Sequence, residues 1–228
     1  MLYAEIDKFD PTGTNVKDCA LTVMDRWILS ELNSLVRFVD EGLEKYQITE
    51  TARKIEEFTD VLSNWYVRRC RERYWGSDMT DDKKAAYATL AHVLTTLSKV
   101  IAPYVPFVAE SIYQNIVRSV DKTAPESVHL TSFPVCDDSL VDKDLERNME
   151  RLTDVVVLGR SARNAANIKN RQPLSKLYII SEGGEKFGGE LTDILADELN
   201  VKQVEYAADS SAFAGYELKP QMRTLGPK

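Results

Sequence analysis

Residues that commonly carry catalysis or bind metals are scarce in this sequence. It has two histidines, His92 and His129, and three cysteines at scattered positions, so no Cys/His spacing of a zinc site is present. His92 falls in a helical pattern, where a core or surface histidine is far commoner than a catalytic one. The odd number of scattered cysteines predicts free thiols in a reducing compartment, which is typical of a cytoplasmic protein.

The motifs of nucleotide-binding and hydrolytic enzymes are also missing. There is no Walker-type loop, no GxGxxG after a predicted strand, and no Ser-His-Asp or Cys-His arrangement. The glycine pairs at 183–184 and 188–189 fit turns better than phosphate loops. We therefore predict no catalytic residue, no cofactor-binding residue and no metal ligand within these residues.

Long hydrophobic runs are absent too. No segment approaches the roughly 18 apolar residues of a membrane-spanning helix, and the first residues lack the pattern of a signal peptide. With 228 residues, 43% of them hydrophobic and 29% charged, the chain can build a buried core as one large domain or two modest ones. We expect a cytoplasmic globular protein without a membrane partner.

Positive charge is in deficit overall, since the formal net charge is -7, and this would normally argue against a nucleic-acid partner. The charges are segregated, however. Residues 160–176 hold five cations and no acid, whereas residues 137–154 hold seven acids and three cations. A basic surface can therefore coexist with an acidic total.

Hydrophobic periodicity predicts helices through most of the chain. After an irregular segment at 1–24, a first helix begins near Asp25, a second near Thr49 and a third after a loop at 76–82, and a fourth runs from Pro106 to about residue 120. Their short connections favour an antiparallel bundle over residues 25–140. The apolar stripe of the first helix is formed by Ile28, Leu32, Leu35, Val39 and Leu43.

The pattern of residues changes in the second part of the chain, residues 141–228. An irregular crossover at 121–138 leads to a fifth helix over 142–167, and strands are predicted at 176–181 and 201–206 around a short helix at 189–199. A third short strand is predicted at 216–220. The predicted fold class is therefore mainly α, an antiparallel helical bundle followed by a small α+β module.

The stretch SNWYVRRCRERYW, residues 63–75, concentrates arginines beside aromatic rings, with Glu72 as its only acid. Trp65 continues the apolar stripe of the second helix and is predicted to lie in the core. The arginines could pair with acids of neighbouring helices, such as Glu31, Glu41 or Glu44. Alternatively they could form a patch that contacts phosphates, to which guanidinium geometry is suited.

A second basic run, residues 159–177, has no compensating acid. The small side chains between its cations would allow another backbone to approach closely. Asn164, Asn167 and Asn170 add donors for phosphate or sugar oxygens. Cations at the end of a helix also suit the helix dipole, so a solvated helix end remains an alternative.

Several segments together resemble isoleucyl-tRNA synthetases, in the eukaryotic-like form that also occurs in some bacteria. These segments are DRWILSELN, SNWYVRRCRERYW, IAPYVPFVAESIYQNI, SVHLTSFP, GRSARNAANIKNRQPLSKL and ELNVKQVEY, and they occur in the family's order over nearly the whole chain. The valyl-tRNA synthetase family shares the bundle more loosely and differs in the tail RQPLSKL.

The resemblance implies the anticodon-binding bundle of the class I type and the first part of a C-terminal region, with residues 1–24 leading in from a catalytic domain. The HIGH-type and KMSKS-type motifs of the family are missing, so we expect these residues alone to have no aminoacylation activity. The parent enzyme would use ATP and Mg to attach isoleucine to tRNA(Ile).

Under this resemblance the expected partners are tRNA(Ile) and the catalytic domain of the same chain, with neither DNA nor a membrane. The expected tRNA-binding residues come from the first two bundle helices and from the second basic run. They are Arg26, Asn33, Arg37, Asn64, Arg68, Arg69, Arg71, Arg73, Lys169 and Arg171. A helical bundle that binds another protein through these arginines is the alternative from a different functional class, and the equivalent valyl domain is the other alternative.

Overall fold

A computed structural model describes residue 4, residues 6–181 and residues 184–207, which form two compact units that divide between Met149 and Glu150. Their boundary falls inside helix α7 (Lys143–Ala165), not ahead of it. The first turn of α7 is held in the first unit, because Glu146 accepts hydrogen bonds from Ser30 (2.5 Å) and Ser34 (2.6 Å). The strand expected at 216–220 lies outside the described residues.

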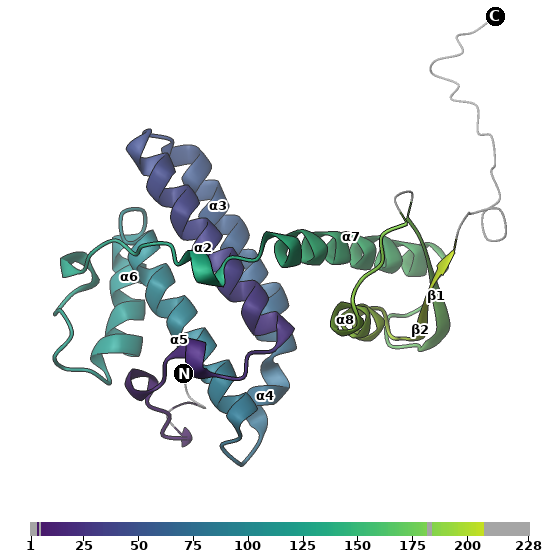
Figure 1. The fold of residues 1–228 in the computed structure, drawn as a ribbon, viewed down its shortest axis with the longest axis horizontal. Helices are drawn as coiled ribbons and strands as arrows, with labels where there is room; N and C mark the ends of the chain where they lie inside the picture. Colours follow the sequence, from purple (N-terminus) through teal and green to yellow (C-terminus); the bar gives the residue numbers. More distant parts are fainter. Residues whose placement is uncertain (1–3, 5, 182–183, 208–228) are drawn as a thin grey trace, which may run out of the picture. The chain divides into compact units, whose positions relative to one another are not determined.

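The first unit is the predicted helical bundle (Figure 1). Its main helices are α2 (Val23–Glu44), α3 (Ile48–Val61), α5 (Asp81–Ile101) and α6 (Pro106–Tyr113), with a short α4 (Arg71–Trp75). Two π-helical turns, η3 (Leu62–Val67) and η4 (Gln114–Arg118), continue α3 and α6. Single 3₁₀ turns are η1 (Pro11–Gly13), η2 (Val16–Asp18), η5 (Val128–Leu130) and η6 (Asp138–Leu140). The predicted fold class is confirmed.

Helix α2 is the central element of the bundle. It begins at a capping box in which the Thr22 side chain accepts from the N–H of Asp25 while Asp25 accepts from the N–H of Thr22. The predicted stripe is buried from Ile28 to Val39, with Ile28, Leu32 and Val39 fully excluded from solvent, and Leu43 at its end is half-buried. Packing of this stripe against α3 and α5 fixes the position of every side chain on the other faces of α2.

Gly42 sets the closest approach of α2 and α3. A Cβ at this position would collide with Cγ2 of Thr51, which is fully buried. The hydroxyl of Thr51 donates toward Gln47 O and Ile48 O (both 2.9 Å) and accepts from Tyr104 (2.6 Å). The glycine therefore does more than weaken the last helical turn, because it makes room for a side chain that joins α3 to the segment after α5.

The π-helical turn η3 changes which residues of the arginine-rich stretch face the core. Wider π-helical winding places every fourth residue on one side, so Leu62, Tyr66, Cys70 and Tyr74 are buried. Trp65, predicted as a core residue, is only half-buried, and the fully buried ring is that of Tyr66. A regular helical period predicts the wrong ring because it misses the extra residue of the π turn.

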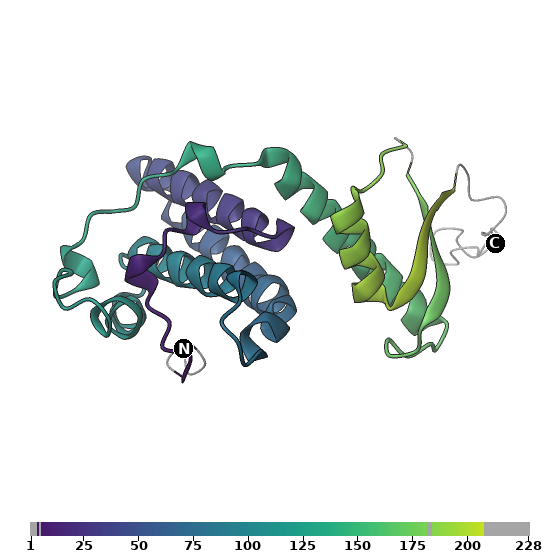
Figure 2. The same ribbon diagram turned by 60° about the horizontal axis from the view of Figure 1, so that its bottom comes forward.

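The second unit contains the rest of α7, strand β1 (Leu174–Ile180), helix α8 (Gly189–Leu199) and strand β2 (Val201–Ala207). The strands pair in parallel, from Leu174 opposite Val201 to Ile180 opposite Ala207, with α8 as the connection (Figure 2). Leu199 packs against α7 at Gly159, where an added Cβ would lie 2.6 Å from the leucine Cδ1. This is the predicted α+β module.

Candidate nucleic-acid interface

An exposed row of polar and aromatic residues runs along η3 and α4. Asn64, Arg68, Arg71 and Trp75 follow one another at helical spacing and are all exposed. Arg68 donates from Nε to the carbonyl of Asn64 (2.7 Å), and its guanidinium lies 5.8 Å from the ring centroid of Trp65. The Arg71 guanidinium lies 5.8 Å from the ring of Trp75. Such cation and ring faces can contact phosphates and stack on unpaired bases.

Arg73 points the other way, into the bundle. It forms a two-fold hydrogen-bonded ion pair with Asp25 (2.8 and 2.9 Å), whose side chain is completely buried. Arg73 Nε also donates to both carboxylate oxygens of Asp82 (3.0 Å each). The buried arginine pair that sequence reasoning left open therefore exists, but its acids are Asp25 and Asp82 and not Glu31, Glu41 or Glu44.

Asp25 accepts further hydrogen bonds from Tyr66 Oη (2.7 Å) and from the Thr22 hydroxyl (2.7 Å). Burial by itself would raise the pKa of Asp25, but the hydrogen bonds from Arg73 and Tyr66 outweigh it and lower this pKa. Burial likewise opposes the charge of Arg73, and the hydrogen bonds to Asp25 and Asp82 raise its pKa. Both groups thus stay ionised, and this network joins three helices.

The α2 face that carries Arg26, Asn33 and Arg37 is covered by the crossover segment before α7. Asn33 is 5% exposed, with Nδ2 donating to Leu29 O (2.8 Å) and Oδ1 accepting from the N–H of Asp137 (2.8 Å). Both ends of its amide are therefore occupied by backbone groups. Asn33 anchors the crossover on α2, and it does not offer an exposed polar group to a ligand.

Arg37 and Arg26 lie at the edges of this covered face. Arg37 is half-exposed, ion-paired with Asp138 and hydrogen-bonded to Cys136 Sγ (3.2 Å). Arg26 is exposed, donates to Leu21 O (3.0 Å) and lines a cavity of about 470 Å³ together with residues 139–144. The sequence could place these residues on one helix face, but it could not show that the crossover returns along that face.

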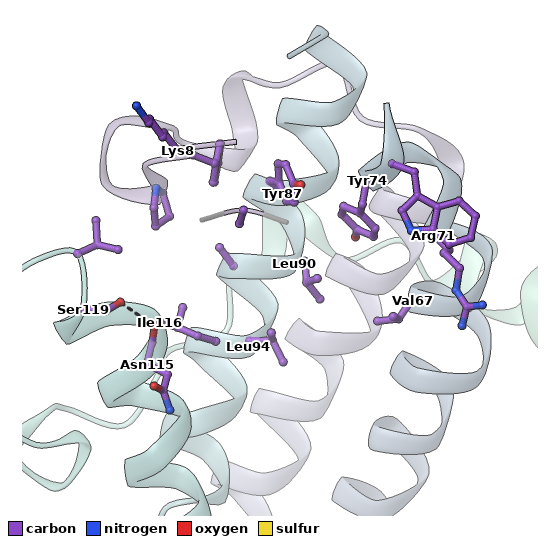
Figure 3. Close-up of a pocket in the computed structure, with 16 residues that line it drawn as sticks. Lys8, Val67, Arg71, Tyr74, Tyr87, Leu90, Leu94, Asn115, Ile116 and Ser119 are labelled. Carbon is purple, nitrogen blue, oxygen red and sulfur yellow. Dashed lines mark hydrogen bonds between the residues drawn. The ribbon is translucent and has the colours of Figure 1, made fainter. Parts of the chain in front are cut away.

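A second, mainly apolar groove of about 480 Å³ lies beside the arginine-rich stretch (Figure 3). Leu90 and Leu94 of α5 lie in its middle, with Val67, Tyr74 and Arg71 on one side. The opposite side is formed by Asn115, Ile116 and Ser119 of the fourth bundle helix. Sequence reasoning missed this groove, because its walls come from segments far apart in the chain.

In the second unit, three of the five cations of the basic run have partners within the fold. Arg160 pairs with Glu198 (2.6 Å) and Lys176 with Glu205 (2.5 Å), and Arg163 is 4% exposed and bound to backbone carbonyls. Lys169 and Arg171 are exposed, and neither side chain has a hydrogen-bond or ion-pair partner among the described residues.

No group of three His, Cys, Asp or Glu side chains placed to hold a metal ion occurs among the described residues. Within the same described ranges no helix is long and apolar enough to cross a membrane.

Comparison with known proteins identifies the family. Residues 25–179 match the family described as the anticodon-binding domain of tRNA ligases. The chain is 52% identical over 227 residues to an isoleucine–tRNA ligase of Clostridium novyi (strain NT), covering 99% of this chain and 21% of the relative. It is 43% identical over 229 residues to isoleucine–tRNA ligase 2 of Bacillus cereus (strain ATCC 14579), covering 100% of this chain and 21% of the relative.

The chain thus spans about one fifth of the length of the curated relatives that it matches. The resemblance to isoleucyl-tRNA synthetases is confirmed by these relatives, while the eukaryotic-like qualifier stays a prediction. Because the family match covers most of the bundle and continues to β1, it includes the arginine-rich stretch and the exposed cations Lys169 and Arg171. The chain belongs to the family of anticodon-binding domains of tRNA ligases.

Proposed function

We propose that this chain is the tRNA-binding part of an isoleucine–tRNA ligase and that it holds the anticodon stem and loop of tRNA(Ile). In the complete enzyme, the remaining part of the protein would activate isoleucine with ATP and Mg and transfer it to the bound tRNA. The family match and the names of the relatives support this proposal. We expect the enzyme to act in the cytoplasm.

The exposed row on η3 and α4 is the observation that carries the proposal. Arg68 and Arg71 present guanidinium groups held beside Trp65 and Trp75, and Asn64 adds an amide at the start of the row. Guanidinium groups bind phosphates in a planar, two-pronged manner, and the rings can stack on bases splayed from the loop. Affinity would come from the phosphates and base selection from the rings and the amide.

The other nominated residues divide according to their environment. Arg69, half-buried next to the row, and Arg26 and Arg37, at the edges of the covered α2 face, stay in the proposed RNA-contacting set. Asn33 and Arg73 are assigned to the fold instead, since their polar atoms are used within the bundle. Arg163, which sequence reasoning did not nominate, is also assigned to the fold.

Arg68→Ala is expected to weaken tRNA binding by roughly tenfold, because a hydrogen bond to a charged group contributes about 1.5 kcal/mol and 1.4 kcal/mol is a factor of ten. The slope of the logarithm of the binding constant against the logarithm of salt concentration should fall by about 1. Fluorescence anisotropy with a labelled tRNA(Ile) transcript at several salt concentrations measures both quantities.

Arg147→Ala is the matched control, since Arg147 is an exposed arginine of α7 whose ion-pair partner among the described residues is the exposed Asp144. It removes the same charge away from the row and should leave the affinity and the salt slope close to those of the unchanged chain. Equal losses in both variants would mean that the row makes no specific contact. Salt-independent binding by the unchanged chain would contradict the proposal altogether.

A second proposal concerns the apolar groove beside α5. Leu90, Leu94 and Ile116 offer a surface unsuited to phosphates but suited to apolar side chains. The curated relatives are about five times as long as this chain, so most of such a ligase lies outside the described residues. We propose that the groove packs against that remaining part of the enzyme, which would include the catalytic domain.

Leu94→Asp should abolish this packing, because a carboxylate would be buried against apolar side chains without a partner. We expect the fraction of this chain captured by the separately produced remainder of the ligase to fall by at least tenfold. Binding of tRNA by the variant chain should be unchanged, which also serves as the check that it is folded. Undiminished capture would show that the groove is not the contact surface.

A further inference from the structure

One guanidinium binds both ends of the turn Lys169–Gln172 in the second unit. Arg163 Nη1 donates to the carbonyls at both ends of the turn, Lys169 O (3.1 Å) and Gln172 O (2.9 Å). Its Nη2 donates to Leu199 O (2.5 Å) and Asn200 O (3.1 Å), at the C-terminal end of α8. One side chain thus joins the turn to the end of a helix from a distant part of the chain.

Further bonds hold the same turn. The N–H of Gln172 donates to Lys169 O (2.9 Å), which closes the turn, and Asn200 Nδ2 donates to Asn170 O (3.2 Å). Pro173 follows directly and fixes its own φ angle. The backbone between the two exposed cations is therefore held in one conformation from both ends.

The charge of Arg163 is not cancelled by the acceptors that hold it. All four are neutral carbonyls, although a guanidinium that is only 4% exposed usually has an acid partner. Glu198, on the last turn of α8, is neutralised by Arg160 instead (2.6 Å). The turn therefore combines two exposed cations, Lys169 and Arg171, with a third positive charge beneath them that is bound by carbonyl groups alone.

We infer that this turn, with Lys169 and Arg171 as ligands and Arg163 as the positioning residue, is a second RNA-contacting element that binds backbone phosphates of the tRNA. The inference rests on the proposed tRNA-binding function. Arginine binds a phosphate through paired N–H groups and lysine binds it as a point charge, so the two side chains suit neighbouring phosphates of one strand.

The turn is expected to strengthen binding without selecting the tRNA. None of its four residues, Lys-Asn-Arg-Gln, is aromatic, so the turn has no ring on which a base could stack. Contacts to phosphates fix the position of the RNA but carry no sequence information. Binding of cognate and non-cognate tRNA should depend on the turn to the same degree, unlike binding through the row at 64–75.

The test uses the whole chain and the double variant Lys169→Gln/Arg171→Gln, with labelled transcripts of tRNA(Ile) and of one non-cognate tRNA. Loss of two phosphate contacts should lower the salt slope by between about 1 and 2. The affinity for both transcripts should fall by the same factor, and the melting temperature should stay the same. Lys122→Gln/Lys186→Gln, which removes two exposed lysines elsewhere, should bind as the unchanged chain does.

Arg163→Lys separates positioning from stability. A lysine cannot donate to four carbonyls in this geometry, so the turn should loosen and the salt slope should fall toward that of the double variant. If Arg163 were only structural, a folded Arg163→Lys chain would keep the full slope.

The inference is overturned if the Lys169→Gln/Arg171→Gln chain binds both transcripts as the control double variant does while Arg68→Ala still weakens binding. If the unchanged chain shows no salt-dependent binding of tRNA, the proposed function fails as well. These two results differ in the behaviour of the unchanged chain, so the failures can be told apart.

Discussion

Arg73→Ala is expected to lower the free energy of unfolding of the bundle by about 3–5 kcal/mol, because it leaves the carboxylate of Asp25 buried without its cation. Tyr66 and Thr22 would still donate to Asp25, but neither carries a charge. Thermal and urea unfolding followed by circular dichroism measure this loss. Its size is a large part of the total stability of an ordinary domain.

Two comparisons sharpen this prediction. Arg71→Ala removes an exposed arginine two positions earlier, and its stability should change by less than about 0.5 kcal/mol. Asp25→Asn/Arg73→Met removes both charges, so it should be more stable than Arg73→Ala alone. A stable Arg73→Ala protein that has lost affinity for tRNA would instead support Arg73 as an RNA contact and overturn its assignment to the fold.

The same pair gives a pH dependence. Because the pKa of Asp25 in the folded state is lowered, the pair stabilises the fold fully above the unfolded pKa of about 4. That contribution is lost as the pH falls through the lower, folded-state pKa. The unfolding free energy of the unchanged chain should therefore fall more steeply with acid than that of Asp25→Asn/Arg73→Met.

Gly42→Ala is expected to destabilise the bundle by about 2 kcal/mol, although alanine is the better helix former. The gain in helix propensity is about 1 kcal/mol, whereas crowding a packed contact costs about 3 kcal/mol. The collision is with Cγ2 of Thr51, which cannot turn away because its hydroxyl is held by Gln47 O, Ile48 O and Tyr104. Chemical denaturation measures the difference.

Thr51→Ser provides the rescue for this variant. Serine keeps the hydroxyl and lacks the methyl group that collides, so Gly42→Ala/Thr51→Ser should recover most of the loss. Gly76→Ala is the control, because an added Cβ there meets no atom within 4 Å. A Gly42→Ala chain as stable as the unchanged one would mean that α2 and α3 separate slightly at no energetic cost.

Much of the fold was predictable because it depends on local patterns. The stripe of α2, the break at Pro103 and Pro106 and the alternation of strand and helix after Pro173 each lie within a short window. Helix α8 begins and ends where its sequence pattern predicts. The π turn was not predictable from a regular period, and it places Tyr66 in the core, whereas Trp65 was the ring predicted there.

The candidate site was predictable only in part. The sequence identified the arginine-rich stretch and the acid-free run, but it could not say which cations have partners far away in the chain. Asn33 meets the backbone of Asp137, and Arg163 meets the end of α8, in contacts that no local pattern shows. The sequence placed the start of a helix near Asp25, but the role of Asp25 as the acceptor for Arg73 depends on the tertiary fold.

The π turn between Leu62 and Val67 determines how a one-residue deletion in this stretch would affect the fold. One residue fewer in the turn would restore ordinary α-helical winding, because the wider turn takes up one extra residue. Tyr74 and Arg73 would then keep their buried side, and Arg68 and Arg71 would stay in the exposed row. A one-residue deletion inside this turn should therefore disturb the fold less than a deletion in the regular winding of α2, which would rotate everything after it by about 100°.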